Sequence, residues 1–450
     1  MGKRFGSSVR RRGGEWPQQD GVLYMSMTVV VMTTSLLITM STSPGYYSVQ
    51  AQQLQLHPVD LGVLQAVKES MWDLPGGTFF SSWQFNFSNS TTDDNPCVSF
   101  SGVQCVNVDG FNRVSSLWLG PQTAGSPGLS GSLSPLLGSL NFLSELTISS
   151  GSVRGTIPES LGNLLSLQMF SCSENRLSGS IPSSFVNLKS LQILQLGMNS
   201  LDGSVPWELG QLPSLKVLVL SDNKLSGPIP LFSANVPLVH LELRNNFFSG
   251  GLPMTLPSSL QYLSLKKNCL TGWLGSGGLM SSSLSNSLSY LDLSYNQFTG
   301  VIPSVLFTFP LTFLLLNHNQ FTEGLSLTAP ISTRSVVDLS YNHLQGPIPS
   351  FLSTAQSLFL NNNFFVGAIS QDFVSHMEAA TLQSLYLQHN YLTDFGSLSS
   401  SVLPSNVAFC VQYNCMLPPP QSLCPEQIPG IEAISRPANE CATVLRSNSP

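Results

Sequence analysis

Three histidines, His240, His318 and His389, occupy outward positions in a series of repeated segments, the last two at equivalent places. An imidazole becomes a catalytic base when a nucleophile and an orienting carboxylate lie within hydrogen-bonding reach. No such pair recurs beside these histidines. The sequence also lacks a phosphate-binding glycine loop, an HExxH motif, paired CxxC motifs, a nucleophile elbow and a kinase signature. It therefore predicts a protein that is not an enzyme, with no catalytic residue, no metal site and no cofactor.

The segments that carry these residues form a long internal repeat. The pattern LxLxxN, with Val in place of one Leu, recurs at intervals of 21 to 28 residues, with its asparagines at Asn199, Asn223, Asn246, Asn268, Asn296, Asn319, Asn342, Asn363 and Asn390. A period of this kind indicates a solenoid built from stacked units. The alternation LxL predicts a short strand with two apolar side chains on one face, which only stacked neighbours can bury.

Each unit also has signals for turning the chain. The asparagine amide can satisfy loop backbone groups that would otherwise be buried without partners. A second phrase follows it, for example Leu225–Pro230 (LSGPIP), where glycine permits a tight bend and proline ends the regular structure. Two longer units hold insertions. Residues 275–287 are expected to form a flexible flanking loop, and residues 372–381 a short helix.

The combination of LxxN with LxGxIP resembles the plant-type leucine-rich repeat family. The resemblance implies an α/β solenoid, a superhelix with a concave parallel β-sheet, 3-10 or helical turns on the convex side, and disulfide-capped ends. The implied domains are an N-terminal cap over residues 53–112, about 12 repeats over 113–406, and a last rung with a Cys-rich C-terminal cap over 407–450.

The caps hold most of the cysteines. The segment Asn95–Cys105 resembles the N-terminal cap of plant leucine-rich repeat receptors, with Phe100 in place of the usual Trp, and implies a Cys97–Cys105 disulfide. Ahead of it, Asp60 is expected to cap a short helix. Four further cysteines near the other end suggest two disulfides with three possible pairings: Cys410, Cys415, Cys424 and Cys441. Cys172 is expected to be a buried thiol, and Cys269 either exposed or partly shielded.

The N-terminus reads as a targeting segment. Residues 1–52 hold five Lys or Arg ahead of an apolar stretch centred on Thr28–Met40. A cleaved secretory signal is favoured over an uncleaved anchor, so the protein is expected to be secreted into the apoplast or cell wall. The alternative is a membrane-anchored protein with its repeats outside, and only then would it contact a membrane. Glycosylation sequons at Asn86 and Asn89 suit this location.

The charge distribution excludes one class of partner. Residues 53–450 hold 13 Lys and Arg against 22 Asp and Glu, which argues against nucleic-acid binding.

The outward strand positions form the candidate binding surface. Adjacent strands lie about 4.8 Å apart, so equivalent positions in successive units form columns. From His240 onward these columns are rich in aromatic and charged residues. The predicted ligand-binding residues are His240, Glu242, Arg244, Tyr262, Lys266, Tyr290, Asp292, Tyr295, Phe313, His318, Tyr341, Phe359, Tyr386 and His389. Outward aromatic side chains beside mixed charge suit recognition of a protein, peptide or glycan.

The resemblance implies an extracellular recognition module in cell-surface signalling or defence. Its partners would be a protein or peptide ligand, a co-receptor or a wall-degrading enzyme. One alternative is a wall protein similar to polygalacturonase-inhibiting proteins. Another is a scaffold similar to leucine-rich repeat extensins, although only Pro418–Pro420 stands where those proteins carry long Ser-Pro tails.

Overall fold

A computed structural model describes residues 55–85, 95–121, 126–280, 284–395, 403–418, 424 and 435–447. These residues belong to one compact unit, Gln53–Pro450. The predicted targeting segment, residues 1–52, and the sequons at Asn86 and Asn89 lie outside the described residues.

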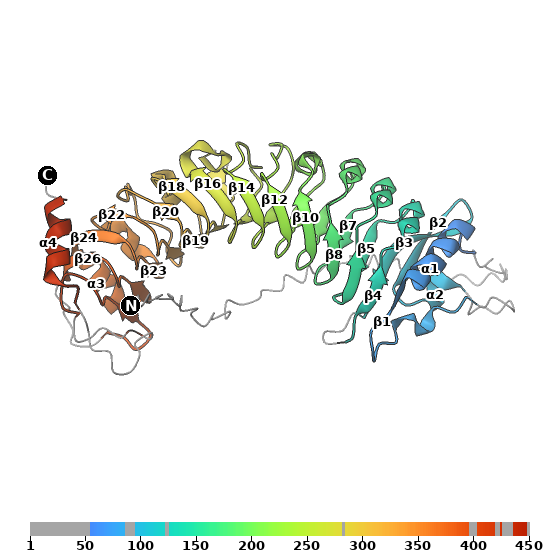
Figure 1. Ribbon diagram of the computed structural model, residues 1–450, viewed down its shortest axis with the longest axis horizontal. Coiled ribbons are helices and arrows are strands. Elements are labelled where there is room, and N and C mark those ends of the chain that lie inside the picture. Colours follow the sequence, from blue (N-terminus) through green and yellow to red (C-terminus); the bar gives the residue numbers. More distant parts are fainter. Residues whose placement is uncertain are drawn as a thin grey trace, which may run out of the picture. The chain divides into compact units, whose positions relative to one another are not determined.

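Within these ranges, the LxL segments form one sheet of 14 strands (Figure 1). The strands pair in parallel with their sequence neighbours, except that the first two are antiparallel. They are β2 (Val103–Val108), β3 (Phe111–Leu119), β5 (Glu145–Ile148), β7 (Met169–Ser171), β9 (Ile193–Gln195), β11 (Val217–Val219), β13 (His240–Glu242), β15 (Tyr262–Ser264), β17 (Tyr290–Asp292), β19 (Phe313–Leu315), β21 (Val336–Asp338), β23 (Ser357–Phe359), β25 (Ser384–Tyr386) and β27 (Ala408–Cys410). We call this the long sheet.

A second row of strands, which we call the lateral sheets, consists mainly of residues that follow the ladder asparagines, and the cap strand β1 joins its first strand, β4, in antiparallel pairing. One has ten described strands: β1 (Met71–Asp73), β4 (Leu129–Ser132), β6 (Ser152–Gly155), β8 (Arg176–Gly179), β10 (Ser200–Ser204), β12 (Lys224–Gly227), β14 (Phe247–Gly250), β16 (Cys269–Trp273), β18 (Gln297–Gly300) and β20 (Gln320–Phe321). The other has three: β22 (Gln345–Gly346), β24 (Phe364–Ile369) and β26 (Tyr391–Phe395).

Short helices close the units. The 3-10 helices are η1 (Phe79–Ser82), η2 (Pro135–Ser139), η3 (Glu159–Asn163), η4 (Ser183–Asn187), η5 (Trp207–Gln211), η6 (Leu274–Ser276), η7 (Gly278–Met280), η8 (Leu284–Asn286), η9 (Ser304–Thr308) and η10 (Ser350–Thr354). The α-helices are α1 (Pro58–Ser70), α2 (Pro96–Ser99), α3 (Gln371–Glu378) and α4 (Ala438–Ser447). The predicted helix in the second insertion is confirmed by α3. The first insertion is not a plain loop, because its described part contains η6, η7 and η8.

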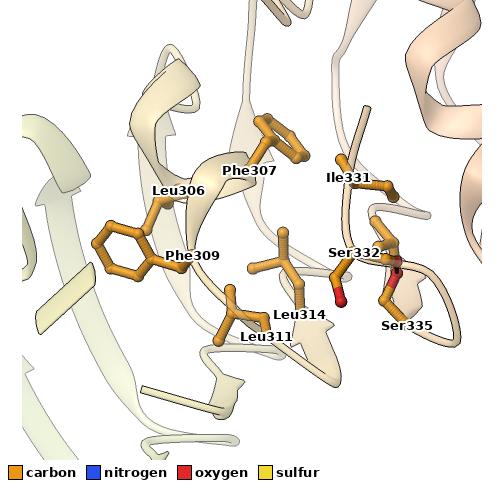
Figure 2. Close-up of a pocket in the computed structure, with 9 residues that line it drawn as sticks. Leu306, Phe307, Phe309, Leu311, Leu314, Ile331, Ser332 and Ser335 are labelled. Atoms are coloured by element: carbon orange, nitrogen blue, oxygen red, sulfur yellow. Dashed lines mark hydrogen bonds between the residues drawn. The ribbon is translucent and has the colours of Figure 1, made fainter. Parts of the chain in front are cut away.

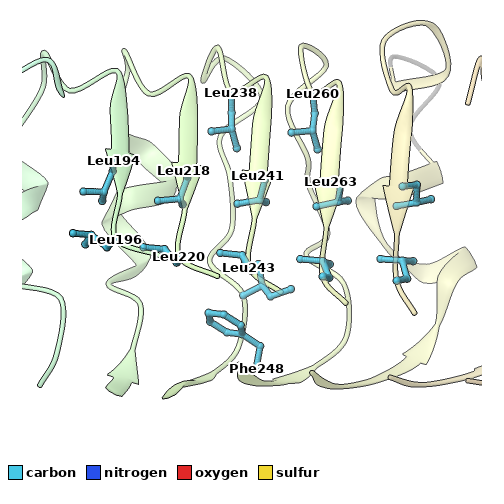
Figure 3. Close-up of a cluster of buried hydrophobic side chains, with 14 of the residues drawn as sticks. Leu194, Leu196, Leu218, Leu220, Leu238, Leu241, Leu243, Phe248, Leu260 and Leu263 are labelled. Atoms are coloured by element: carbon cyan, nitrogen blue, oxygen red, sulfur yellow. The ribbon is translucent and has the colours of Figure 1, made fainter. Parts of the chain in front are cut away.

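The core is a stack of leucines in register. Figure 3 shows Leu194, Leu218 and Leu241 in one row, one from each successive strand. All three are at most 1% exposed. Each fully buried leucine contributes about 2 kcal/mol of hydrophobic free energy, so burial repeated along the stack is the main force holding it together.

The predicted asparagine ladder is confirmed. Asn223 is representative: its Oδ1 accepts a hydrogen bond from the Leu201 backbone N–H at 2.9 Å, and its Nδ2 donates to the carbonyls of Leu196, Leu220 and Ser221. The same arrangement recurs in later rungs. One side chain thus joins two rungs and satisfies the buried backbone at each turn.

The N-terminal cap contains the disulfide that the resemblance implies, but its first helix begins at a different residue from the one predicted. Cys97 and Cys105 form a disulfide, and Phe100 stacks on the fully buried Trp83 with ring centroids 5.2 Å apart. The prediction that Asp60 caps α1 is wrong, because His57 holds that position. Asp60 is buried inside the first turn and binds the Arg113 guanidinium at 2.8 and 3.1 Å, a partner that local sequence patterns do not reveal.

The C-terminal cap resolves the open pairing. Disulfides join Cys410 to Cys424 and Cys415 to Cys441. Arg436 lies over the ring of Tyr391 at 4.0 Å and donates from Nε to the Asn390 carbonyl. The Arg436 backbone N–H also donates to the Asn414 carbonyl at 2.7 Å, so the cap supplies hydrogen-bond partners to the backbone of the last two rungs.

Candidate functional site

The register of the long sheet brings four predicted residues into contact. His240, Tyr262, Tyr290 and Phe313 are direct partners on β13, β15, β17 and β19. Their ring centroids are 4.1, 4.2 and 5.5 Å apart in sequence order, and the first two pairs are nearly parallel, at 6° and 11°. We call these four residues the ring ladder. Neighbouring strands lie about 4.8 Å apart, so aromatic rings at the same position of successive strands come into contact.

A second stack runs beside the ring ladder. The rings of Tyr295, His318 and Tyr341 stack with centroid distances of 4.1 Å for both pairs. These residues precede the ladder asparagines and have φ values of 55°, 54° and 52°, in the left-handed region. We call them the turn rings. A bulky residue is uncommon in this conformation, and the LxLxxN pattern alone does not reveal it.

An ion-pair cluster covers one end of the ring ladder. Glu242 accepts a hydrogen bond from Arg244 Nε at 2.7 Å and lies 3.4 Å from His240 Nε2. Arg244 also pairs with Asp222 at 3.1 Å. Burial alone would raise the pKa of Glu242, but His240 and Arg244 outweigh it and lower the pKa to about 2. Asp222, absent from the predicted site, could have been found from its column position, because it lies one rung before Asn245, the residue next to Arg244.

Two lysines adjoin the turn rings. The ammonium groups of Lys266 and Lys267 lie 5.9 and 5.7 Å from the ring centroid of Tyr295, within cation–π range. In the part of the chain that the structure describes, neither lysine forms an ion pair. Lys267 precedes Asn268 as the turn rings precede their own asparagines, so the two lysines add positive charge at the start of that column.

The structure places Asp292 beneath its neighbours rather than at the surface. It is 2% exposed, and its Oδ1 accepts hydrogen bonds from the Ser294 backbone N–H and hydroxyl at 3.0 and 2.6 Å. Asp338 repeats these contacts with Ser340. Burial raises the pKa of both carboxyls, that of Asp338 to about 6. A ligand bound to the ring ladder would therefore not contact Asp292 directly and would interact with it only through long-range electrostatics.

The two ladder tyrosines are coupled. Their rings stack with centroids 4.2 Å apart, so each phenol is partly buried by the other. Burial, reinforced by nearby carboxylates, raises the pKa of Tyr262 to about 12 and that of Tyr290 further. Both phenols are therefore neutral at physiological pH and act as hydrogen-bonding groups.

The remaining predicted residues lie apart. Phe359 and Tyr386 are neighbours at 4.9 Å, and His389 lies 4.9 Å from Tyr413. Strand β21 separates this group from the ring ladder. Burial and the Arg436 charge lower the pKa of His389. Its role in ligand binding stays a prediction, as for the other site residues.

Among the described residues, cavities, metal sites, membrane-spanning helices and free thiols give little support to another function. One hollow, lined by Leu306, Phe307, Phe309, Leu311, Leu314, Ile331, Ser332, Ser335 and Val337, has room for about one water (Figure 2). No three His, Cys, Asp or Glu side chains are grouped as a metal site requires, and no helix is long and apolar enough to cross a membrane, within the described ranges. Cys172 is buried, which raises its pKa to about 12, and Cys269 is exposed.

Comparison with known proteins agrees with this architecture. The leucine-rich repeat family model matches residues 166–188, 214–235 and 287–309. The solved structure of PEPR1–AtPEP1 is 28% identical with a TM-score of 0.60, covering 79% of this chain and 52% of that one. The plant peptide hormone receptor RGFR1 in complex with RGF2 is 27% identical with a TM-score of 0.54, covering 66% and 48%.

A plant ice-binding protein, 24% identical with a TM-score of 0.52, shares the fold, with 83% of this chain and 100% of that one covered. The chain spans about half the length of the two receptor chains. A search of curated protein sequences finds no match. The repeat model, the receptor structures and the LxxN–LxGxIP units agree: the chain is a plant-type leucine-rich repeat protein.

Proposed function

We propose that the chain is an extracellular recognition module that binds a peptide, or an extended segment of a protein, along the outer face of the long sheet. The observation that carries this proposal is the ring ladder, His240 to Phe313, flanked by the Glu242–Arg244 ion pair and by Lys266. Aromatic side chains and arginine dominate the energetics of many protein interfaces.

The stacking geometry favours a peptide over a sugar. A sugar ring binds an aromatic side chain by lying on its face. In the ring ladder, the faces of His240, Tyr262 and Tyr290 are turned toward one another at 4.1 to 4.2 Å, so solvent meets their edges. Those edges carry the phenol hydroxyls and imidazole nitrogens, which hydrogen-bond to amide groups. An extended peptide presents amides at a regular spacing along its whole length.

The similar receptors support this assignment. One is described as a plant peptide hormone receptor in complex with RGF2, and the other as PEPR1–AtPEP1. The three disulfides suit an oxidising, extracellular compartment. We place the module in cell-surface signalling or defence, with a peptide ligand, a co-receptor or a wall-degrading enzyme as partner.

The test is affinity capture from plant wall and apoplast extracts. The bait is the chain made in a secretory host, and the test variant carries Tyr262→Ala, Tyr290→Ala and Phe313→Ala. The matched control changes three residues at the same strand position in earlier rungs: Met169→Ala, Ile193→Ala and Val217→Ala. All of these side chains are partly exposed, so both triple variants should fold. We expect partners that the control retains and the test variant loses. Equal capture by both variants would refute binding at the ring ladder.

A further inference from the structure

One aromatic side chain outside the long sheet has an open ring face. Trp273 ends β16 on a lateral sheet and is 52% exposed. No other ring contacts it within the described ranges. Its column elsewhere holds small residues, such as Thr156, Ser180 and Ser204. Stacking of the repeat therefore does not require a tryptophan at this position.

The indole is held in a fixed orientation. Its Nε1 donates to the Val301 carbonyl at 3.1 Å, which anchors the pyrrole edge to the next rung. A Cβ added at Gly300 would lie 3.2 Å from Cδ1, so glycine lets that edge pack closely. A Cβ added at Gly275 would lie 2.3, 2.5 and 2.6 Å from three atoms of the six-membered ring. Such similar distances place Gly275 beneath the ring face rather than at its edge. One face thus rests on glycine backbone, and the other accounts for the exposure.

The surroundings of the open face are polar and uncharged. Strand pairing sets Trp273 opposite Thr299 and Thr271 opposite Gln297. Thr271, Gln297 and Thr299 are all exposed, and the period of two puts them on the same face as the indole. The strands β14, β16 and β18 contain no Asp, Glu, Lys or Arg. The expected ligand therefore has a flat apolar face, a rim of hydroxyl groups and no net charge.

We propose that Trp273 is the platform of a carbohydrate-binding site for neutral pyranose units of a polysaccharide. A pyranose with equatorial hydroxyls has a flat face of C–H groups, which stacks on an indole, and a rim that hydrogen-bonds to Thr271, Gln297 and Thr299. Pre-positioning of the indole by Val301 and Gly275 reduces the entropy lost on binding. This site lies on another sheet from the ring ladder and does not depend on the function proposed there.

Affinity electrophoresis of the full chain tests the site. The gels contain xyloglucan, mixed-linkage β-glucan or galactomannan, with polygalacturonate as the charged comparison. We expect at least one neutral polymer to retard the protein. Trp273→Ala should weaken that binding about tenfold or more, as expected on removing a dominant binding residue. The matched control is Trp207→Ala, which removes a tryptophan that is 65% exposed on η5 and should leave binding unchanged.

Two further variants examine the geometry. Trp273→Tyr keeps a smaller ring and should retain part of the affinity. Thr299→Val removes one hydroxyl at nearly constant shape and should weaken binding several-fold, with the fold checked by circular dichroism. Failure of all three neutral polymers to bind would overturn the proposal, as would equal binding by Trp273→Ala. Retardation by polygalacturonate alone would overturn it too. The Tyr262, Tyr290 and Phe313 variant should bind these polymers normally, which separates this site from the ring ladder.

Discussion

Replacing a ladder asparagine should lower the free energy of unfolding much more than replacing an exposed asparagine. In Asn296→Ala, the backbone N–H of Leu270 loses the Asn296 Oδ1 that accepts its hydrogen bond at 3.1 Å. The carbonyls of Leu265, Leu293 and Ser294 lose the Nδ2 donor, at 2.9, 3.1 and 3.2 Å. The site is buried, with Asn296 only 8% exposed, so water cannot readily replace the amide.

The carbonyls are less affected than the N–H. Leu265 still accepts from Asn268, Leu293 from Asn319, and Ser294 from the Lys267 backbone. One buried donor without a partner costs about 1 to 3 kcal/mol, and each lost second bond costs a smaller amount. We therefore expect Asn296→Ala to lower the free energy of unfolding by about 3 kcal/mol. Asn296→Asp should be at least as damaging at pH 7, because a carboxylate would face the three carbonyl oxygens.

Urea unfolding followed by circular dichroism measures the effect from the shift in midpoint. The control is Asn361→Ala, whose partly exposed side chain makes no hydrogen bond of its own to any described residue, and a loss below about 0.5 kcal/mol is expected. Loss of a single sharp transition in Asn296→Ala would indicate that the rungs on either side have uncoupled. A loss of less than about 1 kcal/mol for Asn296→Ala would refute the assignment of the amide as the joint between rungs.

Two other predictions concern backbone strain and pH. Met198 has φ of 54° and is 37% exposed, so Met198→Asn should raise the free energy of unfolding by about 1 kcal/mol, measured in urea; no gain would mean that its left-handed backbone is unstrained. Burial raises the folded-state pKa of Asp338 to about 6, above its ordinary value of 3.8, so its contribution to stability falls as pH rises between these values. Asp338→Asn should therefore stabilise the protein at pH 7.5 and lose that advantage near pH 4, whereas a gain independent of pH would contradict the raised pKa.

The repeat made much of this structure predictable. Once one rung is assigned, the repeat period identifies the equivalent residue in the next rung, which is its neighbour in the sheet. The contact between His240 and Tyr262 can therefore be predicted from their positions in the repeat. Tyr290 stays in register although an insertion precedes it, because the extra residues form η6, η7 and η8 away from the long sheet. Ring columns and the asparagine ladder are both properties of the period itself.

Features that depend on packing between distant residues could not be read in this way. The local sequence around Asp60 predicts a helix cap, because its actual partner, Arg113, lies 53 residues further along the chain and no local pattern indicates it. Asp292 occupies an outward strand position, yet its neighbours' side chains bury it. The period gives the direction of a side chain but not how much its neighbours cover it. The burial of Asp292 and the raised pKa of Asp338 both follow from that covering.

The turn rings occupy backbone positions where the local conformation favours asparagine over a bulky residue. Tyr295, His318 and Tyr341 all adopt positive φ, where Asn245 and Asn362 fit the equivalent position with less strain. Each bulky residue costs about 1 to 2 kcal/mol there. Stacking at 4.1 Å returns about 0.5 to 1.5 kcal/mol per pair, which offsets the strain only in part. Stability alone would therefore favour asparagine in this column. We therefore expect the three consecutive rings beside Lys267 and the ring ladder to contact the proposed ligand.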